Sequence, residues 1–104
     1  MSEAVGLLEV YGLVAAFAAA DAGCKAANVR IETFDRNKPA NAEKLEVPLI
    51  IMVKFRGSVE DTRAALEAGE VAAKRISGVI TKHIIARPEE DLNKFLNING
   101  FDKN

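Results

Sequence analysis

The sequence has one histidine, His83, and one cysteine, Cys24, and these are its first candidates for proton transfer or nucleophilic attack. His83 lies in a β-branched run, Val79–Ile85, which favours a half-buried structural or interface histidine over a general base. Cys24 falls on a helically spaced apolar stripe, where a thiol normally packs as an inert small hydrophobic group. A single cysteine and a single histidine also exclude an internal disulfide and a Cys/His metal cluster.

The acidic residues offer no better catalytic constellation. Glu60 and Asp61, and the run 89–91, each fall in the first turn of an expected helix, where the helix dipole accounts for them. The isolated glycines do not form a phosphate-binding loop after a strand. We therefore predict no catalytic residue, no metal site, no cofactor and no enzymatic activity.

Length and composition set the class of protein. With 104 residues, 49% of them hydrophobic, the chain predicts one domain with a modest core. A formal net charge of −1 argues against nucleic-acid binding. The longest apolar runs are far shorter than the roughly 18 residues of a membrane span, and the first residues do not resemble a signal peptide. We expect a soluble, cytoplasmic protein that contacts neither nucleic acid nor membrane.

The hydrophobic patterns predict the elements that must position any functional residue. Strands are expected over residues 3–11, 29–34, 48–55 and 79–86, helices over 13–27 and 58–76, and a short helix over 88–96. The strand 29–34 is expected to bury one face, and 48–55 both faces. The order is that of an α/β (α+β) fold of ferredoxin-like βαββαβ type, an antiparallel sheet with two helices on one face. Its uncovered face predicts polar residues or a partner subunit.

Both long helices are expected to bury stripes that are rich in small side chains. Eight of the thirteen residues from 15 to 27 are alanine, which allows a close approach of the helix axis. Ser58 is expected to cap the second helix by accepting from the amide of Asp61. The expected stripes are Leu13, Ala16, Phe17, Ala20, Cys24 and Ala27 in the first helix, Val59, Thr62, Leu66, Gly69, Ala73 and Ile76 in the second, and Leu92, Phe95 and Leu96 in the third.

Three segments, taken in order, resemble the bacterial microcompartment (BMC) shell proteins. Gly12-Leu13-Val14-Ala15-Ala16, continued to Asn28-Val29, resembles their first helix and second strand. Arg56-Gly57-Ser58-Val59, followed by the alanine pairs at 64–65 and 72–73, resembles their second helix. His83-Ile84-Ile85-Ala86-Arg87-Pro88 resembles their closing strand and turn. The likeness runs in one copy from about residue 3 to 96, which implies the single-domain, hexamer-forming class.

The resemblance implies a structural subunit and not an enzyme. Such proteins form flat cyclic hexamers that tile into the facets of a shell, together with other shell proteins, around encapsulated enzymes. It implies a single BMC domain over 1–96 with a polar tail over 97–104. Lys25, Asn28 and Arg87 match positions at the hexamer edge, where lysine and arginine would donate to backbone carbonyls or insert into a neighbouring hexamer.

One segment departs from the family. Typical members have a short glycine-containing connection between the second and third strands, which lines a central pore, whereas residues 35–46 here are several residues longer and lack glycine. Six copies of their charges near one axis would repel unless paired. We predict a plugged, enlarged or absent pore, and an iron–sulphur cluster is not expected because the segment has no cysteine. The residues that the resemblance assigns to the pore region are Asp35, Arg36, Asn37, Lys38, Pro39, Glu43 and Lys44. Ala86 and Glu89 also stand where the family usually has proline and histidine.

Two other classes share parts of this pattern. A trimeric ferredoxin-like signalling protein has the same element order and a long loop between strands two and three, through which it would bind a nucleotide. The chain lacks a phosphate-binding basic or glycine cluster outside that loop. A small isomerase-like enzyme would need acid/base residues that the sequence does not assemble.

Overall fold

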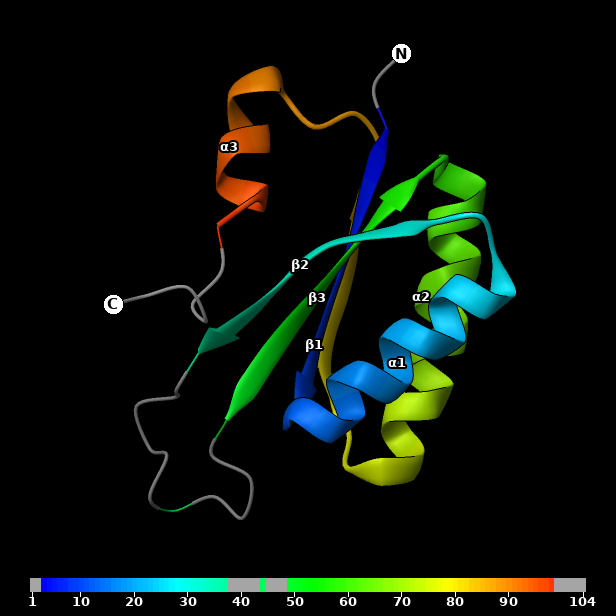
Figure 1. Cartoon of the computed structure of the whole chain (residues 1–104), viewed down its shortest axis with the longest axis vertical. Helices are drawn as coiled ribbons and strands as arrows, with labels where there is room; N and C mark the ends of the chain where they lie inside the picture. The colour runs from blue at the N-terminus through cyan, green and yellow to red at the C-terminus, as the bar shows by residue number, and fades with distance from the viewer. Residues whose placement is uncertain (1–2, 38–43, 45–48, 99–104) are drawn as a thin grey trace.

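In the computed structural model, the described residues are 3–37, 44 and 49–98. Their order confirms the predicted ferredoxin-like α+β fold with a short C-terminal helix (Figure 1). The elements are β1 (Ala4–Tyr11), α1 (Leu13–Ala26), β2 (Arg30–Asn37), β3 (Ile50–Gly57), α2 (Val59–Ile76), β4 (Val79–Ile85), the 3-10 helix η2 (Glu90–Leu92) and α3 (Asn93–Leu96).

The four strands form one sheet in the order β2-β3-β1-β4, and every neighbouring pair is antiparallel. Helices α1 and α2 lie side by side on one face, and α3 lies on the other side of the sheet (Figure 1). The helix-covered face carries the core, because alternate residues of the two central strands point into it. Leu8 and Val10 of β1 and Val53 and Phe55 of β3 are fully buried there.

Small side chains bring the two helices close to the sheet and to each other. The buried residues of α1 are Ala15, Ala16, Ala19, Ala20 and Gly23. A Cβ atom at Gly23 would lie 2.6 Å from the ring of Phe55, and one at Gly69 would lie 3.2 Å from the carbonyl oxygen of Ala19. The space at Gly23 and Gly69 therefore favours glycine, and the alanines beside them keep the packed faces of the helices small.

The predicted stripe of α1 is wrong at its three residues other than alanine. Leu13, Phe17 and Cys24 are exposed, and Phe17 retains 56% of its surface. Its ring instead packs edge-on against that of Phe34 in β2, with centroids 5.0 Å apart. The alanine face lies against α2 and the sheet because that gap is too narrow for a phenyl ring, so the buried face is rotated about the helix axis.

The predictions for the other helices are mostly confirmed. Ser58 caps α2 as expected, since its Oγ accepts from the Asp61 amide at 3.0 Å. Thr62, Leu66, Gly69 and Ala73 are buried as predicted. The exceptions are Ile76 and Phe95, which lie in the last turns of α2 and α3 and are 49% and 58% exposed.

Strand β2 is longer and less regular than predicted. It continues to Asn37, where a loop was expected, because Asp35, Arg36 and Asn37 pair with Met52, Ile51 and Ile50 of β3. The pairing register also shifts between Ile31 and Thr33. This irregularity breaks the strict in–out alternation, and residues 31–35 are all partly buried.

Candidate functional site

The residues implied for assembly lie on the surface. Lys25 is exposed near the end of α1, and its Nζ forms an ion pair with Asp21 Oδ2, one turn earlier, at 2.8 Å. The hydrogen bond from Lys25 to the Asp21 carboxylate raises the pKa of the lysine, which stays charged. An exposed i, i+4 pair contributes little to stability, so Lys25 can exchange this partner for another acceptor.

Asn28 lies at the junction of α1 with the first turn of α2. Its backbone amide donates to Asp61 Oδ1 at 3.4 Å, while Asp61 is also bonded to the cap residue Ser58. A Cβ on Gly57 would lie 3.1 Å from the Asn28 carbonyl oxygen, so the backbones of the two residues pass close together. The position of Asn28 is fixed by its backbone, and its side chain is left at the surface.

Arg87 follows β4 and precedes the buried Pro88. Its side chain is exposed, and within the described part of the chain no hydrogen bond or ion pair joins it to another residue. Because Pro88 is buried and its ring fixes φ, the backbone that follows Arg87 is held in place. Among the described residues, no hydrogen bond or ion pair joins Lys25, Asn28 and Arg87 to one another, and all three are exposed.

The predicted pore region divides into two parts. Asp35, Arg36 and Asn37 belong to the end of β2, contrary to the expectation of a loop, and with Glu9 and Met52 they line a shallow concavity of about 300 Å³. Lys44 is exposed. Lys38, Pro39 and Glu43 lie outside the described residues.

Sequence reasoning missed two buried cations on the face of the sheet opposite α1 and α2. Lys54 and Arg56 of β3 are 5% and 6% exposed. Lys54 lies 3.7 Å from the Asp35 carboxylate, and Arg56 Nη1 donates to Glu32 Oε1 at 3.2 Å. Burial lowers the pKa of Lys54, and the Asp35 carboxylate opposes that shift. A signal was present, because a strand predicted to be buried on both faces contains two cations that require partners.

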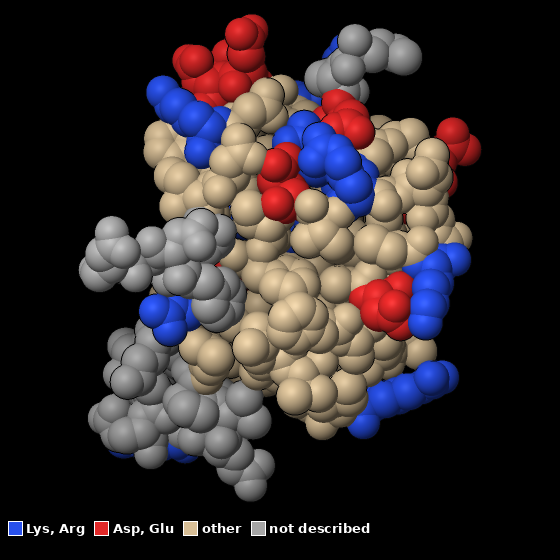
Figure 2. Space-filling model, viewed as in Figure 1, with Lys and Arg blue, Asp and Glu red and all other residues tan. Residues whose placement is uncertain are grey.

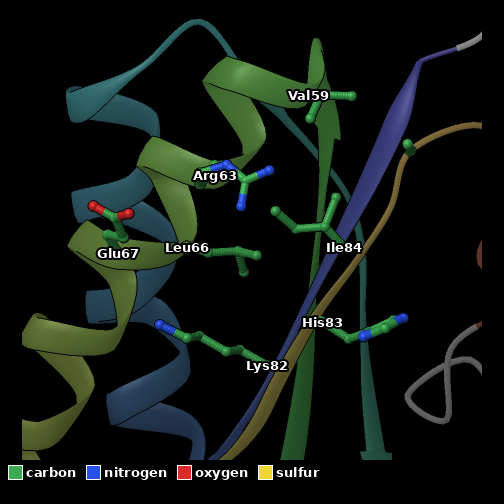
Figure 3. A pocket seen from close by; sticks show the side chains of 8 residues that line it. Val59, Arg63, Leu66, Glu67, Lys82, His83 and Ile84 are labelled. Atoms are coloured by element: carbon green, nitrogen blue, oxygen red, sulfur yellow. The ribbon is translucent and has the colours of Figure 1, made fainter.

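A groove of about 440 Å³ runs between α2 and β4 (Figure 3). Leu66 and Ile84 lie on its apolar wall, with Arg63 and Lys82 nearby, and Lys82 Nζ donates to Glu70 Oε1 at 2.6 Å. His83 borders the groove, but its ring points away from the α2 side, and the residue is exposed. The imidazole has no hydrogen-bond partner among the described residues, and its exposure differs from the half-buried position that the β-branched run predicted.

The chemistry of the remaining groups is limited. Partial desolvation and the Asp21 carboxylate both raise the pKa of the Cys24 thiol, which is opposite to the shift of an activated nucleophile. The described residues contain no group of three His, Cys, Asp or Glu side chains that could hold a metal ion. Among the described helices, none is long and apolar enough to cross a membrane.

Comparison with known proteins places this geometry in a family. The family model of the BMC domain matches residues 4–88, from the first residue of β1 to the Pro88 turn. This chain belongs to the BMC-domain family. The matched region includes Lys25, Asn28 and Arg87 but ends before η2 and α3.

Similar BMC-domain proteins are shell proteins. The chain is 46% identical over 91 residues to the bacterial microcompartment shell protein EutK of Salmonella typhimurium, with 88% of this chain and 50% of EutK covered. It is 38% identical over 94 residues to the shell protein PduA of Citrobacter freundii, covering 90% of this chain and 91% of PduA. The carboxysome shell protein CcmK2 of Synechococcus elongatus is 37% identical over 94% of this chain and 89% of CcmK2. The chain thus spans half the length of EutK and about nine-tenths of the other two.

A solved structure gives the same fold. The crystal structure of a microcompartments protein from Desulfitobacterium hafniense superposes with a TM-score of 0.71 and 25% identity. The match covers 93% of this BMC-domain chain and 48% of that chain. The four-stranded antiparallel sheet with its helices is therefore the arrangement of the BMC domain.

Proposed function

We propose that this BMC-domain protein is a structural shell subunit that forms cyclic hexamers, which tile into the facets of a microcompartment shell in the cytoplasm. It acts without a catalytic site or cofactor, binds neither nucleic acid nor membrane, and has as partners its own copies, other shell proteins and the encapsulated enzymes. The folded unit is a single BMC domain over 1–96, with a polar tail over 97–104.

One observation carries this proposal. PduA of Citrobacter freundii is a bacterial microcompartment shell protein, and the match covers 90% of this chain and 91% of PduA. The likeness is therefore not confined to a fragment of a larger relative with a different task.

The shape of the subunit supports a ring. Strands β2 and β4 are the two edges of the sheet and face away from each other, so the subunit presents two different lateral surfaces. Contacts between unlike surfaces generate a closed ring when the rotation between subunits closes. Figure 2 shows a broad area without charged side chains over α1, with charges gathered around it. The exposed apolar residues of α1 are Leu13, Val14 and Phe17, which favours burial against another copy.

The edge residues are proposed to join hexamers. Lys25 and Arg87 are exposed cations, one on a weak intrahelical pair and the other without a partner among the described residues. Both can donate to backbone carbonyls of a neighbouring hexamer at little cost to the isolated subunit. Asn28 is held by its backbone amide, which donates to Asp61 of α2, and its exposed side-chain amide is free to bond a neighbouring hexamer.

The connection between β2 and β3 is proposed to alter or block the central pore. Asn37 pairs with Ile50, so both ends of the connection meet at one end of the hairpin. The charges of Lys38, Glu43 and Lys44 would gather near a six-fold axis, where like charges repel unless they pair between subunits. Asp35 faces Lys54 within its own subunit, which reduces the charge available to such a rim.

The test is the oligomeric state and its higher assembly. Native mass spectrometry of the full chain should give a species of six times 11.2 kDa, and electron microscopy should show sheets or tubes. Hexamers that form no sheets would support the proposed ring and contradict the proposed tiling of hexamers into facets. A stable trimer whose melting temperature rises with ATP would overturn the proposal in favour of a nucleotide-binding signalling protein.

A further inference from the structure

The face of the sheet opposite α1 and α2 holds two buried cations that the family comparison leaves unexplained. Lys54 and Arg56 alternate along β3 and are 5% and 6% exposed. A buried ammonium or guanidinium group is costly unless charged or polar acceptors surround it. The groups that accept hydrogen bonds from Lys54 and Arg56 are therefore needed to keep these two charges buried on this face.

Most acceptors of Lys54 come from the C-terminal strap, which we define as residues 90–98. Lys54 Nζ donates to the carbonyl oxygens of Leu96 at 3.2 Å and Ile98 at 2.7 Å. The third partner is the Asp35 carboxylate, 3.7 Å away at the end of β2. One ammonium group thus joins the strap to the strand that leads into the segment between β2 and β3.

Two further contacts fasten the strap to the same face. Arg56 Nη1 donates to Asn93 Oδ1 at 3.3 Å as well as to Glu32, and Thr33 Oγ1 donates to the Leu96 carbonyl at 2.9 Å. Leu96 is buried, whereas the neighbouring Phe95 is largely exposed. The strap is therefore held mainly by polar bonds to β2 and β3, with one apolar anchor.

The strap cannot owe its order to its own helix. Helix α3 has four residues, far below the length at which an isolated helix is stable in water. It also lies beyond residues 4–88, the part of the chain that matches the BMC domain. Its conformation must depend on the contacts to Thr33, Lys54 and Arg56.

We propose that the C-terminal strap acts as a clasp, a segment whose attachment through Lys54 is coupled to the order of the end of β2. Detachment of the strap from Lys54 would then loosen the end of β2, and loosening of β2 would weaken the attachment of the strap. The strap and the end of β2 both contact the buried ammonium group of Lys54, so each affects its position. Because such coupling is reciprocal, a change in either segment should affect the other. The strap then sets the rigidity of the strand that enters the predicted pore region. This coupling is a property of the subunit and does not depend on the proposed shell function.

Hydrogen–deuterium exchange of the full chain tests the clasp. Lys54→Met removes the charge with little change in volume, so the fold is expected to persist. Amides of the strap and of residues 33–37 should exchange at least about tenfold faster, because hydrogen bonds from a charged group are lost. The control is Lys94→Met, a strap lysine whose Nζ lies over the ring of its neighbour Phe95 at 5.6 Å. It should leave both segments unchanged.

A second variant approaches the clasp from β2. Asp35→Asn keeps the size of the side chain and removes the carboxylate beside Lys54, and coupling predicts faster exchange in the strap, which carries no substitution. This variant decides the question if Lys54→Met does not fold. Strap exchange that stays unchanged in Asp35→Asn would overturn the coupling. A strap that loosens in Lys54→Met while β2 keeps its protection would overturn it equally.

Discussion

At the scale of single residues, the close packing of α1 on β3 depends on the absence of a side chain at Gly23. A Cβ there would lie 2.6 Å from two ring atoms of the fully buried Phe55. Alanine is the better helix former by about 1 kcal/mol, but overpacking of a fixed ring costs about 1–3 kcal/mol. The steric cost is larger because the ring cannot move out of the core.

We therefore expect Gly23→Ala to lower the free energy of unfolding by about 1 kcal/mol, which is the middle of the overpacking range less the gain in helix propensity. Urea denaturation followed by circular dichroism measures this change. The adjacent Cys24→Ala is the matched control, since Cys24 is exposed on the same turn and should change stability by less than about 0.5 kcal/mol. A Gly23→Ala protein as stable as the control would mean that α1 can move away from β3 without loss.

The sequence contained part of this residue-scale information. Its alanine content predicts close helix packing, and the structure confirms it at Ala16 and Ala20. Hydrophobicity alone placed Phe17 and Cys24 inside, because periodicity ranks residues by polarity and takes no account of the space between layers. Two of the three partners of Lys54, the carbonyl oxygens of Leu96 and Ile98, could not be predicted, since they are backbone groups that any residue type would provide.

At the scale of elements, the order and type of the four strands and of α1 and α2 follow from hydrophobic pattern and capping, whereas several boundaries do not. The strand predicted over 48–55 is β3 (Ile50–Gly57), and the helix predicted over 88–96 is the 3-10 helix η2 followed by α3. The end of β2 shows the reason most clearly. Asp35, Arg36 and Asn37 are polar and favour turns, so local preference predicts a loop. Their backbones instead pair with β3, and the bonds of an established ladder outweigh such a preference. The end of β2 is thus determined by its neighbour in the sheet, which local sequence does not contain.

Because β2 extends to Asn37, only residues 38–49 connect it to the paired part of β3, and we expect residues 38–48 to contribute little to stability. Replacing residues 38–48 with a short glycine-containing turn should change the free energy of unfolding by about 1 kcal/mol or less, because loop closure depends weakly on length. Asn37 and Ile50 pair with each other, and Leu49 O accepts from the Gly12 amide, so both ends are already fixed. Denaturant unfolding monitored by circular dichroism gives the result.

A longer deletion provides the control for that experiment. Removing residues 35–37 as well takes away three paired positions of β2 and the Asp35 partner of Lys54, and should destabilise the protein markedly. If the shorter deletion alone abolishes cooperative unfolding, residues 38–48 contribute to the core and are not an insert at the pore.

At the scale of the whole molecule, the proposed shell function has two levels of assembly, the hexameric ring and the sheet of tiled hexamers. A substitution can affect one level without the other. A ring uses the lateral surfaces at β2 and β4, whereas tiling is proposed to use the edge residues Lys25, Asn28 and Arg87. Substitution at an edge should therefore act on sheets and leave rings intact. Lys25 is the best choice because its described contact, to Asp21, is exposed and confined to its own helix.

Lys25→Ala is expected to abolish sheet formation while hexamers and subunit stability stay unchanged, because the lost pair with Asp21 is exposed to solvent and contributes little to folding. Electron microscopy measures the sheets, and native mass spectrometry measures the hexamers. Lys74→Ala is the matched control, since Lys74 forms a similar i, i+4 pair with Glu70 on α2, at 3.1 Å, and is not one of the proposed edge residues. Sheets that persist in Lys25→Ala, or that disappear equally in Lys74→Ala, would show that the edge lies elsewhere on the subunit.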